Sequence, residues 1–261
     1  MFTGFANQST AEYEIITPQT NLSFSVRSLT VQEEEKLKGS FVSNAKITEH
    51  LNQCIWDSMT KKPKEIKDYA SFLKNVSVKD RDGLLFGIYH ITYDEIRNYD
   101  ITCGKCEKEY SVTIKASDTF TMEPYPGKDV LTKRVKVKLK NGVTAVIRQA
   151  TLFDEQEAIK QLLNRPGMSM DLISETLIIE RFEEDIETKT EPVVYDHRID
   201  IIDAYKTLAA MDKRVIFRDY KENFGKFGVK LAMTSFCDKC GQKEDVTINL
   251  VQSFYRALHE L

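Results

Sequence analysis

Two Cys-x-x-Cys pairs limit what this 261-residue chain can fold into more than any other feature of its sequence. They are Cys103–Cys106 and Cys237–Cys240. Two intervening residues let both sulfurs of a pair face one ion, and structural zinc takes four ligands in a tetrahedron. Because one pair supplies only two ligands, we expect Cys103, Cys106, Cys237 and Cys240 to hold one structural zinc ion. Such a site would join two distant parts of the chain.

Free thiols in an exposed turn, or one transient disulfide, are alternatives to zinc at these pairs. A third alternative is redox catalysis, for which a Cys-x-x-Cys pair lies where a strand enters a helix. Strand-forming residues flank both pairs, so the redox alternative is disfavoured. The fifth cysteine, Cys54, lies among Leu51, Ile55 and Trp56 on a predicted helix, and we expect it to be a small core residue rather than a ligand.

The cysteine pairs belong to a longer internal repeat. Residues 26–34 match residues 147–155 at an offset of 121. Leu84-Leu85-Phe86 and Tyr89 match Val215-Ile216-Phe217 and Tyr220 at an offset of 131, and the cysteine pairs match at 134. Val112-Thr113-Ile114 recurs as Val246-Thr247-Ile248. The constant order and slowly growing offset predict a tandem duplication with a boundary in the turn-forming residues 124–127.

Each copy predicts a β-hairpin, then helices, then a hairpin that carries the cysteine pair. The fold class is therefore α+β, a tandem duplication of this unit with the copies related by a pseudo-twofold axis; we assign residues 1–125 to the first repeat and 126–261 to the second. Alternating apolar residues and Asn141-Gly142 indicate a hairpin at the start of the second copy. Thr30 with Glu33 forms a capping box, which Thr151 with Asp154 repeats less well because aspartate is shorter. The predicted strands are 13–16, 22–26, 135–140 and 143–147, and the other predicted helices are 47–59, 66–75, 172–182, 201–211 and a closing helix at 250–261.

Composition argues against several function classes. The 37 basic and 40 acidic residues give a net charge of −3, which disfavours a dedicated nucleic-acid or membrane-surface binder. The longest uncharged run, residues 15–26, is too short to span a bilayer, for which about 20 apolar residues are needed. No basic segment precedes it, so we expect no secretory signal and a reducing compartment.

No motif singles out a catalytic site. The sequence contains no Walker loop, G-x-S-x-G or H-x-x-x-H motif, and its four histidines are expected to be surface or hydrogen-bonded side chains. Gly225 to Gly228 is read as a loop. Residues 128–140 carry six basic side chains and one acid, which predicts an exposed strand whose lysines discourage edge pairing, with an anionic partner as the alternative. Residues 180–191 carry six acids and two bases, which predicts a solvated helix end and loop, or a docking segment for a basic partner.

The combination of size, an opening hairpin, amphipathic helices and two knuckle hairpins resembles the T4-type phage baseplate proteins, a family that includes components of the central hub and its assembly. The residues that carry the resemblance are 84–89, 101–106 and 236–240. The resemblance implies a structural, non-enzymatic role in a contractile tail, within a larger assembly at the hub or alongside the tape-measure protein. It implies other tail and baseplate proteins as partners, and a location in the virion tail baseplate and in the host cytoplasm during assembly.

A zinc-ribbon module that binds nucleic acid is the alternative function. Such modules need basic and aromatic side chains beside the knuckles. The flanks here are mixed in sign, with Lys105, Glu107, Lys108 and Glu109 at one pair and Asp238, Lys239, Lys243, Glu244 and Asp245 at the other. We therefore expect no specific binding to nucleic acid and no membrane contact.

Overall fold

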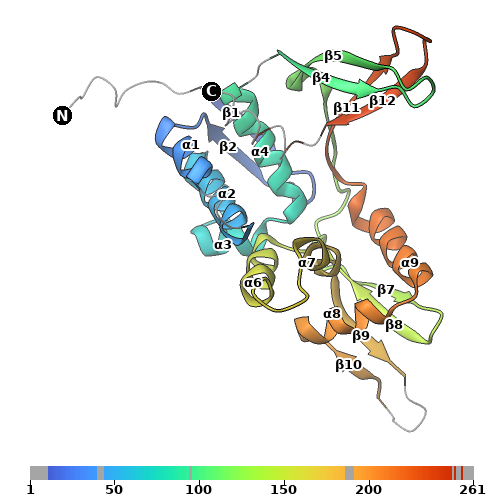
Figure 1. Ribbon diagram of the computed structural model, residues 1–261. Coiled ribbons are helices and arrows are strands. Elements are labelled where there is room, and N and C mark those ends of the chain that lie inside the picture. The colour runs from blue at the N-terminus through green and yellow to red at the C-terminus, as the bar shows by residue number, and fades with distance from the viewer. Residues whose placement is uncertain are drawn as a thin grey trace.

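Short antiparallel hairpins alternate with helices along the chain, so the predicted α+β class is confirmed (Figure 1). The computed structural model describes residues 11–39, 44–93, 96–185, 191–248, 250 and 254. The helices are α1 (Val31–Lys38), α2 (Asn44–Ser58), α3 (Tyr69–Asn75), α4 (Val78–Tyr93), α5 (Ala116–Thr119), α6 (Leu152–Leu162), α7 (Met170–Leu177), α8 (Arg198–Thr207), α9 (Ala210–Tyr220) and the π-helical turn η3 (Lys221–Gly225). The strands are β1 (Glu12–Ile16), β2 (Ser23–Arg27), β3 (Met59–Lys61), β4 (Ile96–Thr102), β5 (Glu109–Lys115), β6 (Phe120–Glu123), β7 (Val135–Lys138), β8 (Val143–Ile147), β9 (Ile179–Glu184), β10 (Val193–Tyr195), β11 (Gly228–Phe236) and β12 (Lys243–Ile248).

The described strands form four antiparallel sheets. Their strand orders are β1-β2-β3, β10-β9-β8-β7, β12-β11-β6 and β4-β5. In the third sheet Glu123 of β6 lies opposite Gly228 of β11. Because β6 ends just before the predicted boundary and β11 begins about a hundred residues later, the chain between them leaves and returns at the same place.

The two predicted opening hairpins are present, β1 with β2 and β7 with β8. Each is followed by a helix that begins with a complete capping box, at Thr30 for α1 and at Thr151 for α6. The shorter Asp154 makes the box as well as Glu33 does, since it accepts the Thr151 N–H at 2.8 Å. The capping acids also accept two hydrogen bonds each from an arginine, Arg27 at the end of β2 for Glu33 and Arg148 directly after β8 for Asp154.

The buried apolar side chains form a first core, a second core and a smaller third one. The first core packs α2, α3 and α4 against β2, and it also takes in Leu231 of β11 and the helical residues Leu250 and Phe254. The second core packs α8 and α9 against the sheet of β7, β8 and β9, through Val137, Ala145, Phe182, Ile201, Tyr205 and Ile216. The third core lies between α6, α7 and α8.

A buried polar network joins the first and second cores. Asp80, on the first turn of α4, accepts hydrogen bonds from the backbone N–H groups of Gln19 at 2.7 Å and Ser77 at 3.1 Å. The Gln19 side chain accepts from Ser77 Oγ at 2.8 Å and donates to the carbonyl oxygens of Phe224 and Phe227. Close by, residues 76–78 form an antiparallel β-bridge with residues 150–152. Backbone hydrogen bonds therefore connect the segments that lead into α4 and α6.

The structure corrects three sequence predictions. The helix predicted over 172–182 ends at Leu177, and residues 179–184 form β9, because this segment hydrogen-bonds to β8. The acidic segment that begins at Glu180 is therefore partly a strand rather than a helix end and loop. The helix predicted over 201–211 is two helices, α8 and α9, separated by extended backbone at Leu208 and Ala209. Of the closing helix predicted over 250–261, only Leu250 and Phe254 belong to the described residues.

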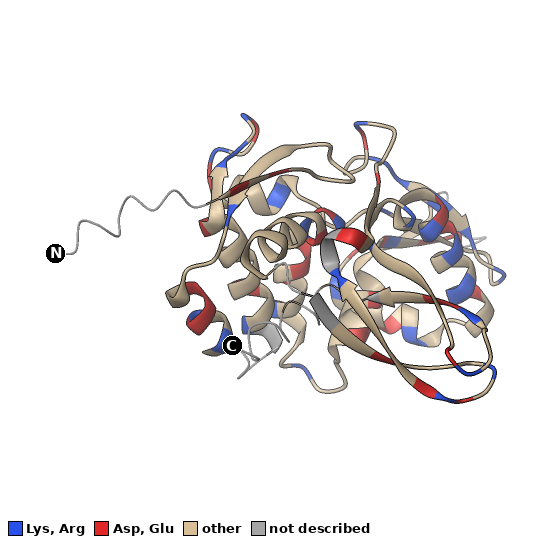
Figure 2. Ribbon diagram, turned by 90° about the horizontal axis from the view of Figure 1, so that it is seen from above, with Lys and Arg blue, Asp and Glu red and all other residues tan. Residues whose placement is uncertain are grey.

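The basic segment 128–140 contains β7, which is an edge strand with Lys136 and Lys138 exposed, as predicted. Basic and acidic residues are interspersed over the helices and strands (Figure 2). Within the described ranges, each helix is too short or too polar to cross a membrane.

Candidate metal centre

Each cysteine pair lies in the turn of a two-stranded hairpin, β4-β5 for Cys103 and Cys106 and β11-β12 for Cys237 and Cys240. The two turns have the same backbone hydrogen bonds. The first cysteine donates its N–H five residues ahead, to Lys108 or Gln242, at 2.9 Å in both turns. Its carbonyl oxygen accepts from the fourth residue after it, Glu107 or Gly241. Both of these residues have left-handed backbone, with φ of 57° and 68°.

The two turns meet, and they bring together the four cysteines that the sequence singled out. Cys103 Sγ lies 3.7 Å from Cys240 Sγ, and Cys106 Sγ lies 3.7 Å from Cys237 Sγ. All four sulfurs lie within 4.8 Å of one another. Zn–S bonds of about 2.3 Å in a tetrahedron require S–S separations of about 3.8 Å, which the two distances of 3.7 Å nearly match. The arrangement is compatible with a metal site.

Burial and hydrogen bonding make the four thiols unequal. Cys103 and Cys237 are buried, whereas Cys240 is exposed. Burial opposes ionisation of Cys237, but the backbone N–H of Cys240 donates to its sulfur and contributes to lowering its pKa to about 7. For Cys103 the N–H of Cys106 favours the thiolate, but burial and the hydrogen bonds with neighbouring thiols raise the pKa to about 12. Nearby N–H groups and sulfurs thus already favour one thiolate in the cluster.

Polar contacts between the hairpins hold the turns against each other. Lys108 Nζ donates to Asp238 Oδ2 at 2.7 Å, and the Gly104 N–H donates to Glu244 Oε1 at 3.0 Å. Tyr110 Oη and Ser235 Oγ are 2.8 Å apart, further from the turns. In the sequence these charges are only mixed in sign around each cysteine pair. Which charged side chains pair depends on how the hairpins pack, and no local sequence pattern indicates it.

The other residues considered from the sequence lie outside this cluster. Cys54 is buried in the first core, as predicted, and burial raises the pKa of its thiol to about 12. Among the described residues no histidine joins the cysteine cluster, and His259 lies outside them. Gly225 ends the π-helical turn η3 and Gly228 begins β11, so this segment is a connection between elements.

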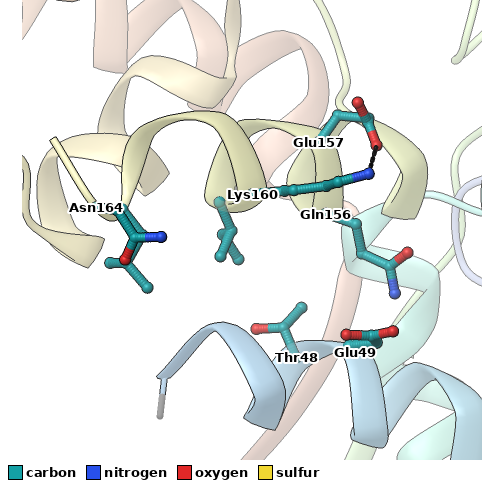
Figure 3. A pocket seen from close by; sticks show the side chains of 8 residues that line it. Thr48, Glu49, Gln156, Glu157, Lys160 and Asn164 are labelled. Carbon is teal, nitrogen blue, oxygen red and sulfur yellow. Dashed lines mark ion pairs between the residues drawn. The ribbon is translucent and has the colours of Figure 1, made fainter.

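A groove of about 390 Å³ between α2 and α6 is a second candidate site (Figure 3). Its wall combines polar and charged side chains, of which Glu157 and Lys160 pair with each other. The lining residues are Thr48, Glu49, Gln156, Glu157, Ile159, Lys160, Leu163 and Asn164. This set contains no cysteine or histidine and no nucleophile paired with a base, so the cysteine cluster is the stronger candidate.

One comparison with known proteins gives a match. Residues 10–256 match the family model described as T4 bacteriophage base plate protein. The match covers most of the chain and includes both cysteine pairs. Comparisons with curated proteins and with solved structures return no match.

Proposed function

Because the chain belongs to the T4 bacteriophage base plate protein family, we propose that it is a structural or assembly component of a contractile tail baseplate, in the hub region, without catalytic activity. The family match over residues 10–256 carries this proposal. It agrees with the resemblance noted from the knuckle hairpins. The partners would be other tail and baseplate proteins, including the tape-measure protein, and the protein would act in the virion tail and in the host cytoplasm during assembly.

We also propose that the four cysteines bind one structural zinc ion. The support is that the four sulfurs lie within 4.8 Å of one another, with two S–S distances of 3.7 Å, close to the separation of about 3.8 Å that a tetrahedral zinc site needs. Four protein ligands leave no open position for water, so the ion would supply a cross-link and no catalysis. Binding free energy at such a site becomes folding free energy, because the site does not exist in the unfolded chain.

We infer that the chain arose by tandem duplication, with repeats at 1–125 and 126–261. Matched residues make matched contacts, which supports the inference. Arg27 and Arg148 each donate two hydrogen bonds to the capping acid six residues later. The two cysteine turns share their backbone hydrogen bonds, and Phe86 and Phe217 both lie on helices, α4 and α9. Superposition of an experimental structure of the two repeats tests the pseudo-twofold axis.

Metal analysis tests the zinc proposal. Purified protein with its thiols kept reduced should contain about one zinc per chain. Cys103→Ser should lose it, and Cys54→Ala, the matched control, should retain it. A wild-type protein without metal would contradict the proposal.

Deletion of the gene tests the baseplate proposal. Infection should then give heads without functional tails, and the wild-type gene supplied in trans should restore them. Mass spectrometry of purified tails distinguishes a resident component from an assembly factor that leaves. Normal tails from the deletion would refute both roles.

One observation favours the alternative, a nucleic-acid module. Phe236, directly before Cys237, is 64% exposed, and an exposed aromatic side chain beside a knuckle can stack on a base. The nearby Lys108 is already paired with Asp238, which leaves less positive charge for phosphate. We expect no retention on duplex DNA at about 0.15 M salt, where phosphate contacts would otherwise hold the protein. Retention that is lost in Phe236→Ala would support the alternative.

A further inference from the structure

The four-stranded sheet of the second core has two edges, one formed by β7 and the other by β10. β7 pairs only with β8, and β10 pairs only with β9, among the described residues. All three pairings in this sheet are antiparallel. Because the four strands alternate in direction, β7 and β10 run in opposite directions. A second copy in the same orientation can therefore place its β7 beside β10 as an antiparallel neighbour. The order of strands therefore permits head-to-tail extension.

The β7 edge is basic. Lys136 and Lys138 are exposed on β7, and Lys140 is exposed just after it. The backbone N–H of Lys140 donates to Asp212 Oδ1 at 3.0 Å, which places the start of α9, with the exposed Arg214, beside this edge. Lys138, Lys140 and Arg214 have no ion-pair partner within the described part of the chain, so their charges remain free for a partner.

The β10 edge is acidic. Val194 is 47% exposed on β10 and is flanked by the exposed Glu191 and Asp196. The exposed acids of α8 lie next to this edge, because Asp200 and Asp203 line a cavity of about 430 Å³ together with Tyr195 of β10. The lining of the cavity is partly apolar, because it includes Phe182, Leu208 and Val143.

The charges of the β7 edge and the β10 edge are complementary both in the layer of strands and in the layer of helices. Helices α8 and α9 both pack on the core-facing side of the sheet, since Tyr205 and Ile216 belong to the same core. Lys136 already pairs with Glu183 of β9 at 2.8 Å, so in a head-to-tail contact the strand layer would bring the unpaired Lys138 to Val194 and its acidic neighbours. The helix layer would bring Arg214 to the acids of α8. Lysine stems can cover an exposed valine while their ammonium groups meet carboxylates.

We propose that the β7 edge of one copy docks on the β10 edge of a second copy, as a heterologous, head-to-tail contact. Like charges at β7 oppose the symmetric β7–β7 contact, so the charges select the head-to-tail arrangement. A contact of this kind closes into a ring or continues as an open chain, depending on the rotation between copies. The proposal does not depend on the baseplate role.

Sedimentation of the full chain tests the contact. At about 50 mM salt and chain concentrations from about 10 to 200 µM, the weight-average mass should rise with concentration, and about 0.5 M salt should reverse the rise because exposed charges are screened. The double variant Lys138→Glu/Arg214→Glu should weaken association by about tenfold or more. The matched control, Lys64→Glu/Lys67→Glu, changes the net charge equally at exposed residues that flank Ile66 of the first core, and it should associate like the wild type.

A charge exchange makes the test specific. Asp196→Lys/Asp200→Lys should also abolish self-association, and mixing it with Lys138→Glu/Arg214→Glu should restore hetero-association, because each variant then offers an edge complementary to the other. A monomer at all concentrations in low salt would overturn the proposal, as would equal losses in the edge variant and the control. Association that the β7 variant loses and the β10 variant keeps would indicate another contact. Retention of the wild type on DNA through Lys138 and Arg214 without self-association would assign the basic edge to a polyanion instead.

Discussion

Replacing Asp80 should weaken the connection between the first and second cores more than any exposed substitution. Its carboxylate accepts four hydrogen bonds, from the backbone N–H groups of Gln19, Thr20 and Ser77 and from Thr20 Oγ1. Asp80→Ala removes the acceptor for all four donors. Asp80→Asn keeps the shape but presents an N–H₂ group where the Ser77 N–H and Thr20 Oγ1 now donate.

The expected loss follows from which donors can reach water. Gln19 and Ser77 are fully buried, whereas Thr20 is half-buried and can be hydrated. Two buried donors without a partner cost about 1–3 kcal/mol each. Asp80 is itself fully buried, so its carboxylate is poorly solvated and its pKa is raised, and removal of this carboxylate offsets part of the loss. We therefore expect Asp80→Ala to lower the free energy of unfolding by about 2–4 kcal/mol and Asp80→Asn by about 1–3 kcal/mol.

Urea unfolding followed by circular dichroism measures these changes, with Glu65→Ala as the control. Glu65 is exposed and should change stability by less than about 0.5 kcal/mol. Because the Gln19 side chain donates hydrogen bonds to the carbonyl oxygens of Phe224 and Phe227, Asp80→Ala should also speed amide hydrogen exchange around residues 224–228. A loss below about 1 kcal/mol, or unchanged exchange in that segment, would refute the view that this network fixes one core to the other.

Three further predictions concern the cysteine turns and the capping boxes. Cys103→Ser should lower stability by several kcal/mol as well as removing the metal, whereas added chelator should destabilise the wild type and leave this variant unchanged; equal chelator effects would contradict the cross-link. Glu107→Gly should stabilise the protein by up to about 1 kcal/mol in thermal unfolding, since φ is 57° there and glycine already stands at the matched Gly241; a loss of stability would show that the Glu107 side chain contributes instead. Arg148, with the Thr151 N–H, outweighs the effect of burial and lowers the pKa of Asp154 to about 2, below its unfolded value of about 3.9, so this carboxylate stabilises the fold above about pH 4, and the contribution disappears as the pH falls towards 2. Asp154→Asn should reduce the loss of unfolding free energy between about pH 4 and pH 2. An unchanged loss over this pH range would exclude the Arg148–Asp154 pair as its source.

Local signals in the sequence predicted the elements that local interactions determine. Asn141-Gly142 marks a tight turn that needs positive φ, and Gly142 has φ of 85°. The capping boxes at Thr30 and Thr151 depend on residues three apart and are both complete. The cysteine pairs were predicted to meet because one zinc ion needs four ligands, and their sulfurs do lie together.

Elements that depend on distant partners were harder to predict. The apolar run Leu177-Ile178-Ile179 fits a helix or a strand equally well, and only pairing with β8 makes its second part a strand. The break at Leu208 has neither glycine nor proline to mark it. Glu244 and the Lys108–Asp238 pair contact the other hairpin across more than a hundred residues, so no spacing rule identifies them. The Asp80 network likewise depends on a contact 61 residues apart in the chain.

The pairing of Glu123 with Gly228 gives the second core the layout of an insertion. Residues 124–227 depart from the β6–β11 sheet and come back to it at directly opposite positions, so the distance between the ends of this segment is that of two neighbouring strands. A two-residue hairpin turn spans the same gap. The exposed loops of this segment, away from its contacts with the first core through α6 and Gln19, can therefore change in length without requiring β6 and β11 to move. Surface variation in this protein should accordingly concentrate in those loops.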